Sequence, residues 1–267
     1  PDAHTEAPTA GSVLLAALLL KLGAYGFLRF SLPIVPHASA FFAPLMIALS
    51  LIAIVYIGII AIKQQDMKRL IAYSSIAHMG FVTLGLFMIF SLAKAPAYAI
   101  LGFEGAVVQM IAHGFSSGAL FLGFGLLYAR LHTRKISNLG GIAKVMPYFS
   151  ACFILYAFSN TGLPGTAGFI GEFMVIIAAV KANLIIAGAA ATALFIGASY
   201  TLWMVKQSFY GPITHHDVEK LTDLTPQEWL PLLILAALIL FMGLHPDPLI
   251  HLIHQPSVHL IQTVLKA

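Results

Sequence analysis

Long apolar stretches dominate the pattern along the chain, and charged residues or Pro and Gly bound each of them. A helix needs about 20 apolar residues to cross the hydrocarbon core of a bilayer. Seven segments come close to or exceed that length, at residues 11–32, 41–62, 69–93, 103–129, 146–180, 184–209 and 228–245. The pattern therefore predicts an all-α polytopic membrane bundle over residues 11–246, preceded by a loop over 1–10 and followed by a C-terminal tail over 247–267.

The fifth segment is too long for one straight crossing and contains the run TGLPGTAG at residues 161–168. Proline removes a backbone donor and glycine weakens a helix, so we expect a broken helix here. Irregular backbone at membrane depth persists only where protein or a water-filled cavity satisfies its polar groups. Many transporters build ion sites at such breaks.

The composition excludes a water-soluble domain. Only 9% of the 267 residues are charged and 60% are hydrophobic, whereas soluble domains carry about 25% charged residues. The net charge of +4 is scattered over short loops, so no nucleic-acid-binding face is expected. Cys152 is the single cysteine, which excludes an intrachain disulfide and a cysteine-based metal or iron–sulfur site.

Loop charges predict the orientation. Lys63, Asp66, Lys68 and Arg69 fall on the same side as Arg130, Arg134, Lys135, Lys144 and the mixed stretch 206–228. The opposite side receives the nearly uncharged 33–40 loop, a loop with Lys94 and Glu104, then Lys181 and the C-terminus with Lys266. By the positive-inside rule, the first side faces the cytoplasm of a bacterium or the matrix of an organelle.

Few ionisable residues lie deep in the predicted spans. Lys21 lies about ten residues, or roughly 15 Å, from either end of the first segment, beyond the reach of a snorkelling side chain. Burying a charge at that depth costs about 2.5–3.5 kcal/mol on insertion scales, so a partner, a cavity or a function should offset it. Glu172 follows the break, where it could carry a proton or cap the second half-helix.

His78 and His113 each lie about ten residues into their segments, at the depth expected for Lys21. Histidine titrates near neutral pH and relays protons through either ring nitrogen, although a single histidine also serves as a packing residue. The four side chains together predict a proton-carrying row across the membrane midplane. Arg29 can snorkel to the interface, Arg134 is interpreted mainly as an orientation charge, and the histidines near the C-terminus predict no metal site.

Several motifs resemble the antiporter-like subunit 4 family of respiratory complex I, whose bacterial members are the M-type subunits. The resemblance rests on PDAHTEAPTAGSV at 1–13, LLK at 19–21, KRLIAYSSIAHMG at 68–80, IAHG at 111–114, HTR at 132–134, LPGT at 163–166 and FIGEF at 169–173. It runs from Pro1 to about Pro246. The first and third of these motifs are long and specific.

The resemblance implies the later seven of fourteen helices, arranged as inverted repeats with a broken helix in each, and proton pumping through linked half-channels. Lys21 would match the connecting lysine, His78 and His113 the midplane histidines, and Glu172 the glutamate that exchanges protons with the outside. Arg29 and Arg134 would match arginines common in the family. The earlier helices have no counterpart in this sequence, so we expect part of a longer protein, a split-gene product or a truncated reading frame.

The resulting expectation is a non-redox, proton-translocating subunit of NADH:quinone oxidoreductase in a bacterial cytoplasmic or mitochondrial inner membrane. NADH, FMN, iron–sulfur clusters and quinone are expected on partner subunits, with no cofactor in this chain. Expected partners are other membrane-arm subunits, a chain supplying the earlier helices, lipid and protons, but no nucleic acid. A subunit of a multisubunit cation/proton antiporter, a membrane-bound hydrogenase subunit and a non-transporting scaffold remain alternatives.

Overall fold

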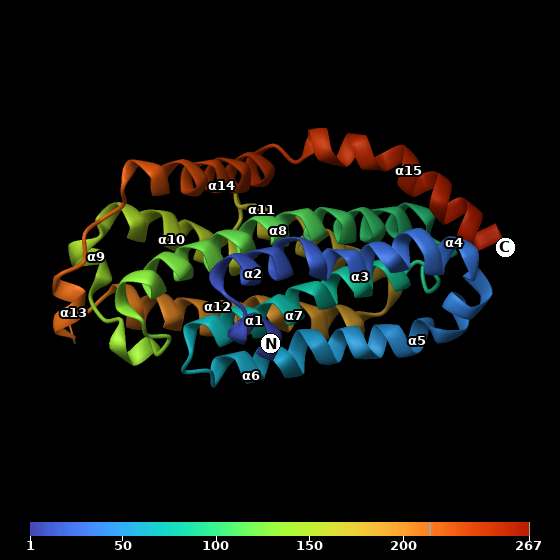
Figure 1. Ribbon diagram of the computed structural model, residues 1–267. Coiled ribbons are helices and arrows are strands. Elements are labelled where there is room, and N and C mark those ends of the chain that lie inside the picture. The colour runs from blue at the N-terminus through green and yellow to red at the C-terminus, as the bar shows by residue number, and fades with distance from the viewer. Residues whose placement is uncertain (214, 267) are drawn as a thin grey trace.

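The long helices run side by side along one common axis (Figure 1) in the computed structural model, which describes residues 1–213 and 215–266. Within these residues, six helical stretches are long and apolar enough to span a bilayer: Thr9–Ile34, Pro36–Ile62, Met67–Phe87, Pro96–Leu131, Leu184–Phe209 and Pro226–Leu244. A seventh crossing is divided between α10 (Pro147–Asn160) and α11 (Ala167–Ala182). The predicted all-α membrane bundle with one broken helix is confirmed.

The first two spans contain π-helical turns. Thr9–Ile34 joins α2, α3 and α4 through such turns at Leu15–Leu19 and Phe27–Ser31, and Pro36–Ile62 joins α5 and α6 through one at Ala53–Ile57. The component helices are α2 (Thr9–Leu14), α3 (Leu20–Gly26), α4 (Leu32–Ile34), α5 (Pro36–Ile52) and α6 (Gly58–Ile62). A π turn shifts the backbone register by one residue and occurs often at functional sites.

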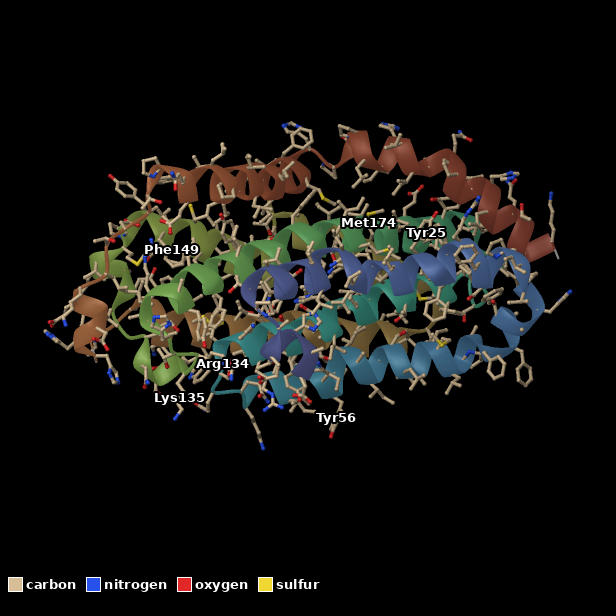
Figure 2. The ribbon with its side chains drawn as sticks, viewed as in Figure 1. Tyr25, Tyr56, Arg134, Lys135, Phe149 and Met174 are labelled. Atoms are coloured by element: carbon tan, nitrogen blue, oxygen red, sulfur yellow. The ribbon has the colours of Figure 1, made fainter. Side chains whose placement is uncertain are left out.

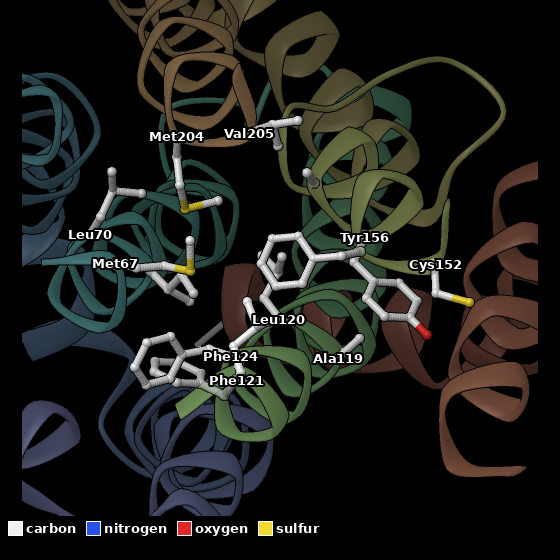
Figure 3. Packing of buried hydrophobic residues seen from close by; sticks show 14 of the residues in the cluster. Met67, Leu70, Ala119, Leu120, Phe121, Phe124, Cys152, Tyr156, Met204 and Val205 are labelled. Atoms are coloured by element: carbon white, nitrogen blue, oxygen red, sulfur yellow. The ribbon is translucent and has the colours of Figure 1, made fainter. Parts of the chain in front are cut away.

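The helices α7 (Met67–Phe87) and α8 (Pro96–Leu131) form the centre of the bundle. In its most apolar window α7 is 78% buried, whereas α12 (Leu184–Phe209) and α14 (Pro226–Leu244) are each 28% buried. Figure 3 shows Met67 and Leu70 of α7 packed with Leu120 and Phe124 of α8, beside Tyr156 and Met204. Two central helices therefore hold the others in place.

The charged loops lie toward the end of the bundle that holds α9 (Ile142–Val145) and α13 (His216–Glu219) (Figure 1). The short helix α1 (Asp2–Glu6) contacts the start of α7 beside these loops, where Asp2 accepts a hydrogen bond from Arg69 at 2.6 Å. The N–H of Met67 donates to the carbonyl of Arg134 at 2.9 Å, and that of Ile136 donates to the carbonyl of Gln65 at 3.0 Å. Arg134 and Lys135 lie close together there (Figure 2). The loops predicted to share one side do so.

Several predicted boundaries differ from the structure. The third span ends at Phe87 and the fourth begins at Pro96, because hydropathy alone does not locate the turn before a proline. Residues 1–10, expected as a loop, contain α1 and the start of α2. The expected tail contains α15 (Asp247–Lys266), whose Ser257, Ile261 and Val264 are buried while much of its opposite face is exposed. An amphipathic helix lacks the continuous apolar run that marks a membrane span.

Candidate functional site: a buried row of titratable side chains

Lys21 begins the row from the first span. Its Nζ donates to the carbonyl of Ala16 at 2.6 Å and lies 2.5 Å from Nδ1 of His113. Ala16 precedes Lys21 by five residues and belongs to the π-helical turn Leu15–Leu19. The π turn thus supplies a carbonyl to the ammonium, and the imidazole supplies a second acceptor for its protons. Two acceptors therefore hold the partly buried Lys21 side chain.

His113 continues the row on α8 and is only 3% exposed. The hydroxyl of Ser117, one turn further on, donates to the carbonyl of His113 at 2.6 Å. The ring centroid of His113 lies 5.7 Å from that of His78 on α7. Both rings have an Nε2 atom that is buried without a protein hydrogen-bond partner. The two central helices therefore bring both histidines into one polar layer.

Glu172 closes the row on α11. One carboxylate oxygen, Oε1, lies 2.5 Å from Nδ1 of His78 and accepts a hydrogen bond from Nε2 of Gln109 at 2.8 Å. Glu172 is 3% exposed and His78 is 8% exposed. A buried carboxylate requires such partners because an unpaired one would be very costly.

The helix break places Glu172. The loop at the break comprises residues 161–166. The φ angles of +71° at Gly162 and +90° at Gly165 lie in the left-handed region, which favours glycine. A Cβ on Gly162 would lie 3.4 Å from Oε2 of Glu172, so the loop passes directly over the carboxylate. Beyond the loop, Gly171 packs against the backbone of Gln109. Small residues on both sides let α11 approach α8 closely enough for the glutamate to join the row.

The row can hold protons at each member. An ammonium stands at one end, a carboxylate at the other, and two imidazoles lie between them, each able to accept at one ring nitrogen and donate from the other. The charges at the two ends balance when Lys21 is protonated and Glu172 is ionised. Protonation of Lys21 or Glu172 changes the electrostatic energy of the other residue, because the protein between them has a low dielectric constant.

The sequence predicted four of these residues, and the structure brings all four together. It does not bring Arg29 or Arg134 into the row. Arg29 is exposed on the first span, eight residues beyond Lys21. Arg134 lies at the charged-loop end, where it pairs with Asp66 at 3.3 Å and donates to the carbonyl of Thr5 at 2.9 Å.

Gln109 was not identified from the sequence, although this residue contacts Glu172 directly. It precedes His113 by four residues and so lies on the same face of α8. The spacing of four residues from His113 could have identified Gln109, but an uncharged amide stands out less than a charged residue in an apolar helix. A cavity of about 410 Å³ also opens beside Lys21, with Ala17, Met110, Phe115 and Leu235 among its apolar walls.

Comparison with known proteins identifies the family. Residues 1–197 match the family model described as NADH:quinone oxidoreductase/Mrp antiporter, transmembrane. The chain belongs to this family. It is 43% identical over 262 residues to NADH-quinone oxidoreductase subunit M of Rhodobacter capsulatus, covering 98% of this chain and 49% of that protein.

Solved structures share the fold. A chain of respiratory complex I from Thermus thermophilus superposes with a TM-score of 0.86 at 28% identity, over 96% of this chain and 52% of that one. A chain of the Mrp complex from Dietzia sp. DQ12-45-1b gives a TM-score of 0.82 at 20% identity, over 98% of this chain and 56% of that one, a likeness of fold alone. The chain spans about half the length of the curated relatives it matches. Membership of this family, with the six apolar spans, establishes an integral membrane protein of the antiporter-like type.

Proposed function

We propose that the chain carries protons within the membrane arm of an NADH:quinone oxidoreductase, through the row Lys21–His113–His78–Glu172. The observation that carries this proposal is the continuity of the row: Lys21 lies 2.5 Å from His113, the two histidine rings are neighbours, and His78 lies 2.5 Å from Glu172. The named relative from Rhodobacter capsulatus supports the assignment to this enzyme.

Each proton step uses an atom pair in the row. Lys21 gives a proton from Nζ to Nδ1 of His113, which becomes able to release one from Nε2. His78 accepts at Nε2 and passes a proton from Nδ1 to Oε1 of Glu172. A water between the two Nε2 atoms completes the path, since buried water typically bridges polar groups that lack protein partners. Each transfer breaks one N–H or O–H bond and forms one N–H or O–H bond, with no change in oxidation state.

The driving reaction belongs to other chains in this proposal. NADH, FMN, iron–sulfur clusters and quinone are held by partner subunits, and the single cysteine of this chain, Cys152, cannot supply the ligand set of an iron–sulfur cluster. The proposed role is therefore that of a translocase subunit without a redox centre. Its partners are neighbouring membrane-arm subunits and a segment or chain that supplies the earlier helices.

Proton uptake into proteoliposomes tests the proposal, with the assembled complex containing this chain and NADH as reductant. Lys21→Ala and Glu172→Gln should reduce the protons moved per NADH oxidised, whereas Lys63→Ala and Glu219→Gln, both at exposed positions, should not. Native gels establish that each variant complex assembles. If both row variants assemble and pump normally, the row only packs helices and the chain is a scaffold.

A further inference from the structure

His4, which is half-buried, shares an unusual feature with the two histidines of the row. Nε2 of His4, like Nε2 of His78 and His113, is buried without a protein hydrogen-bond partner. His4 belongs to α1, and its ring stacks on Phe121 of α8 with centroids 5.7 Å apart. Its carbonyl accepts a hydrogen bond from Ser12 at 2.8 Å, which fixes α1 against α2. An imidazole held this firmly with an unsatisfied nitrogen is expected to hydrogen-bond water.

The position of His4 continues the row toward the charged loops. Phe121 follows His113 by eight residues on α8, so His4 lies about 12 Å along the helix axis from that histidine. Burial lowers the pKa of His4 below its ordinary value of 6.5, and the positive charges of Lys21 and Lys68 add to this effect. The neutral, proton-accepting form of His4 therefore dominates near neutral pH.

A polar cavity at the charged-loop end is lined by Thr5, the residue that follows His4 in α1. It has a volume of about 340 Å³, and its walls include Thr5, Glu6, Lys68 and Arg134. Lys68 is 6% exposed, and its ammonium donates to the carbonyl of Ala7. A second polar cavity of about 470 Å³ shares Thr5, Glu6 and Arg134 with the first and extends to Asp66 and Arg69. Polar walls thus reach from the charged loops to the residues that flank His4.

We propose that His4 is the proton inlet of the row, taking protons from this polar cavity and passing them through water to Lys21. The inference rests on the proposed function of the row. In each cycle an N–H bond forms on His4 as water in the cavity releases a proton, and it breaks when the proton passes to the unprotonated amine of Lys21. Lys68 and Arg134 give this cavity two positive charges, and Glu6 offsets one of them. The neutral resting imidazole is suited to accept.

Two substitutions separate proton transfer from packing. His4→Phe keeps an aromatic ring to stack on Phe121 but cannot take up a proton, and His4→Gln keeps polarity without titrating. In the assembled complex, each substitution should lower the rate of proton uptake driven by NADH by roughly 100-fold. This is the lower end of the effect expected when a positioned acid–base group is lost. His216→Gln, at an exposed position, is the matched control and should pump normally.

Chemical rescue adds a measurement that would not change if His4 served only in packing. His4→Ala should regain pumping when imidazole is added, but not with pyrazole, a ring of the same size that takes up no proton near neutral pH. Normal pumping in His4→Phe, or equal rescue by imidazole and pyrazole, would show that His4 is not the proton inlet. If Lys21→Ala also pumps normally, the proposal that the row carries protons is wrong. If Lys21→Ala is defective while His4→Phe is normal, only the inlet is wrong.

Discussion

Lys21 shows how a charge is held at membrane depth. Its ammonium is bound by a carbonyl of the π-helical turn and by the imidazole of His113, so both acceptors stabilise the charged form. The same contacts allow a proton to leave, because His113 is itself a base. A residue that only needed a positive charge for packing would have no use for a titratable acceptor.

Lys21→Arg distinguishes these two roles. Arginine keeps the positive charge, and the 410 Å³ cavity beside Lys21 gives the longer side chain room, so we expect the complex to assemble. A guanidinium does not release its proton in proteins, so proton uptake should fall as far as it does in Lys21→Ala. Proteoliposome assays on both variants measure this, and normal pumping by Lys21→Arg would mean that the lysine serves as a fixed charge.

Individual charged residues were predictable because the chain has so few of them. Lys21 and Glu172 stand out in apolar segments, and counting residues from the segment ends put His78 and His113 at the same depth. The contacts were less predictable. Which face of a helix a side chain occupies depends on helix rotation, and the π turn before Lys21 alters that rotation without leaving a sequence pattern. His4 was missed because residues 1–10 were expected to form a loop, and Gln109 because an uncharged amide stands out less in an apolar segment.

The broken helix is the element on which the position of Glu172 depends. Its glycines were visible in the sequence and their effect was predicted, whereas the close approach of the two half-helices was not. A Cβ on Gly168 would lie 1.9 Å from the carbonyl oxygen of Ser159. Pro and Gly indicate where a helix stops, but not how tightly its continuation packs on the first half.

Gly168→Ala should therefore destabilise the break. Overpacking costs about 1–3 kcal/mol in ordinary cores, and the obstacle here is backbone that cannot rotate away. Gly188→Ala is the matched control, since a Cβ there meets nothing within 4 Å and alanine favours a helix by about 1 kcal/mol. The temperature at which the chain loses protease resistance should fall for Gly168→Ala only. Equal behaviour of the two variants would contradict the packing described here.

A contact between His254 and Glu104 joins α15 to α8, beside the buried apolar contacts of Ile261 and Val264. Nδ1 of His254 lies 2.7 Å from Oε1 of Glu104, whose side chain is 6% exposed. His254→Ala leaves this buried carboxylate without its partner, at a cost of about 1–3 kcal/mol. We expect faster hydrogen exchange in α15, with His251→Ala, at an exposed position of the same helix, as control. Unchanged exchange in His254→Ala would show that apolar contacts alone hold α15.

At the scale of the whole molecule, the two ends of the bundle differ in charge. Arg130 forms a two-oxygen contact with Glu228 at 2.8 Å, and Arg134 ties the 132–146 loop to Asp66. The alternation of the spans predicted which loops share an end, and the side of the membrane that each end faces stays a prediction of the positive-inside rule. The lateral packing of helices was not predictable, since apolar faces look alike in sequence whether they meet lipid or protein.

Cysteine labelling tests the orientation. With Cys152 replaced by Ala, single cysteines at Lys63 or Lys135 should react only from the cytoplasmic or matrix side, and those at Lys94 or Lys181 only from the opposite side. All four positions are exposed. An impermeant maleimide applied to sealed vesicles of known sidedness gives the answer. Labelling of Lys63 and Lys181 positions from the same side would contradict the arrangement.

The central claim is that a proton moves along the row during turnover, and infrared difference spectroscopy of the assembled complex tests it most directly. Spectra recorded with and without NADH should show a change in the carbonyl-stretch region of protonated carboxylic acids. That band should vanish in Glu172→Gln and persist in Glu219→Gln. A spectrum that keeps the full band in Glu172→Gln, with the complex assembled and oxidising NADH, would mean that Glu172 does not exchange a proton in the cycle.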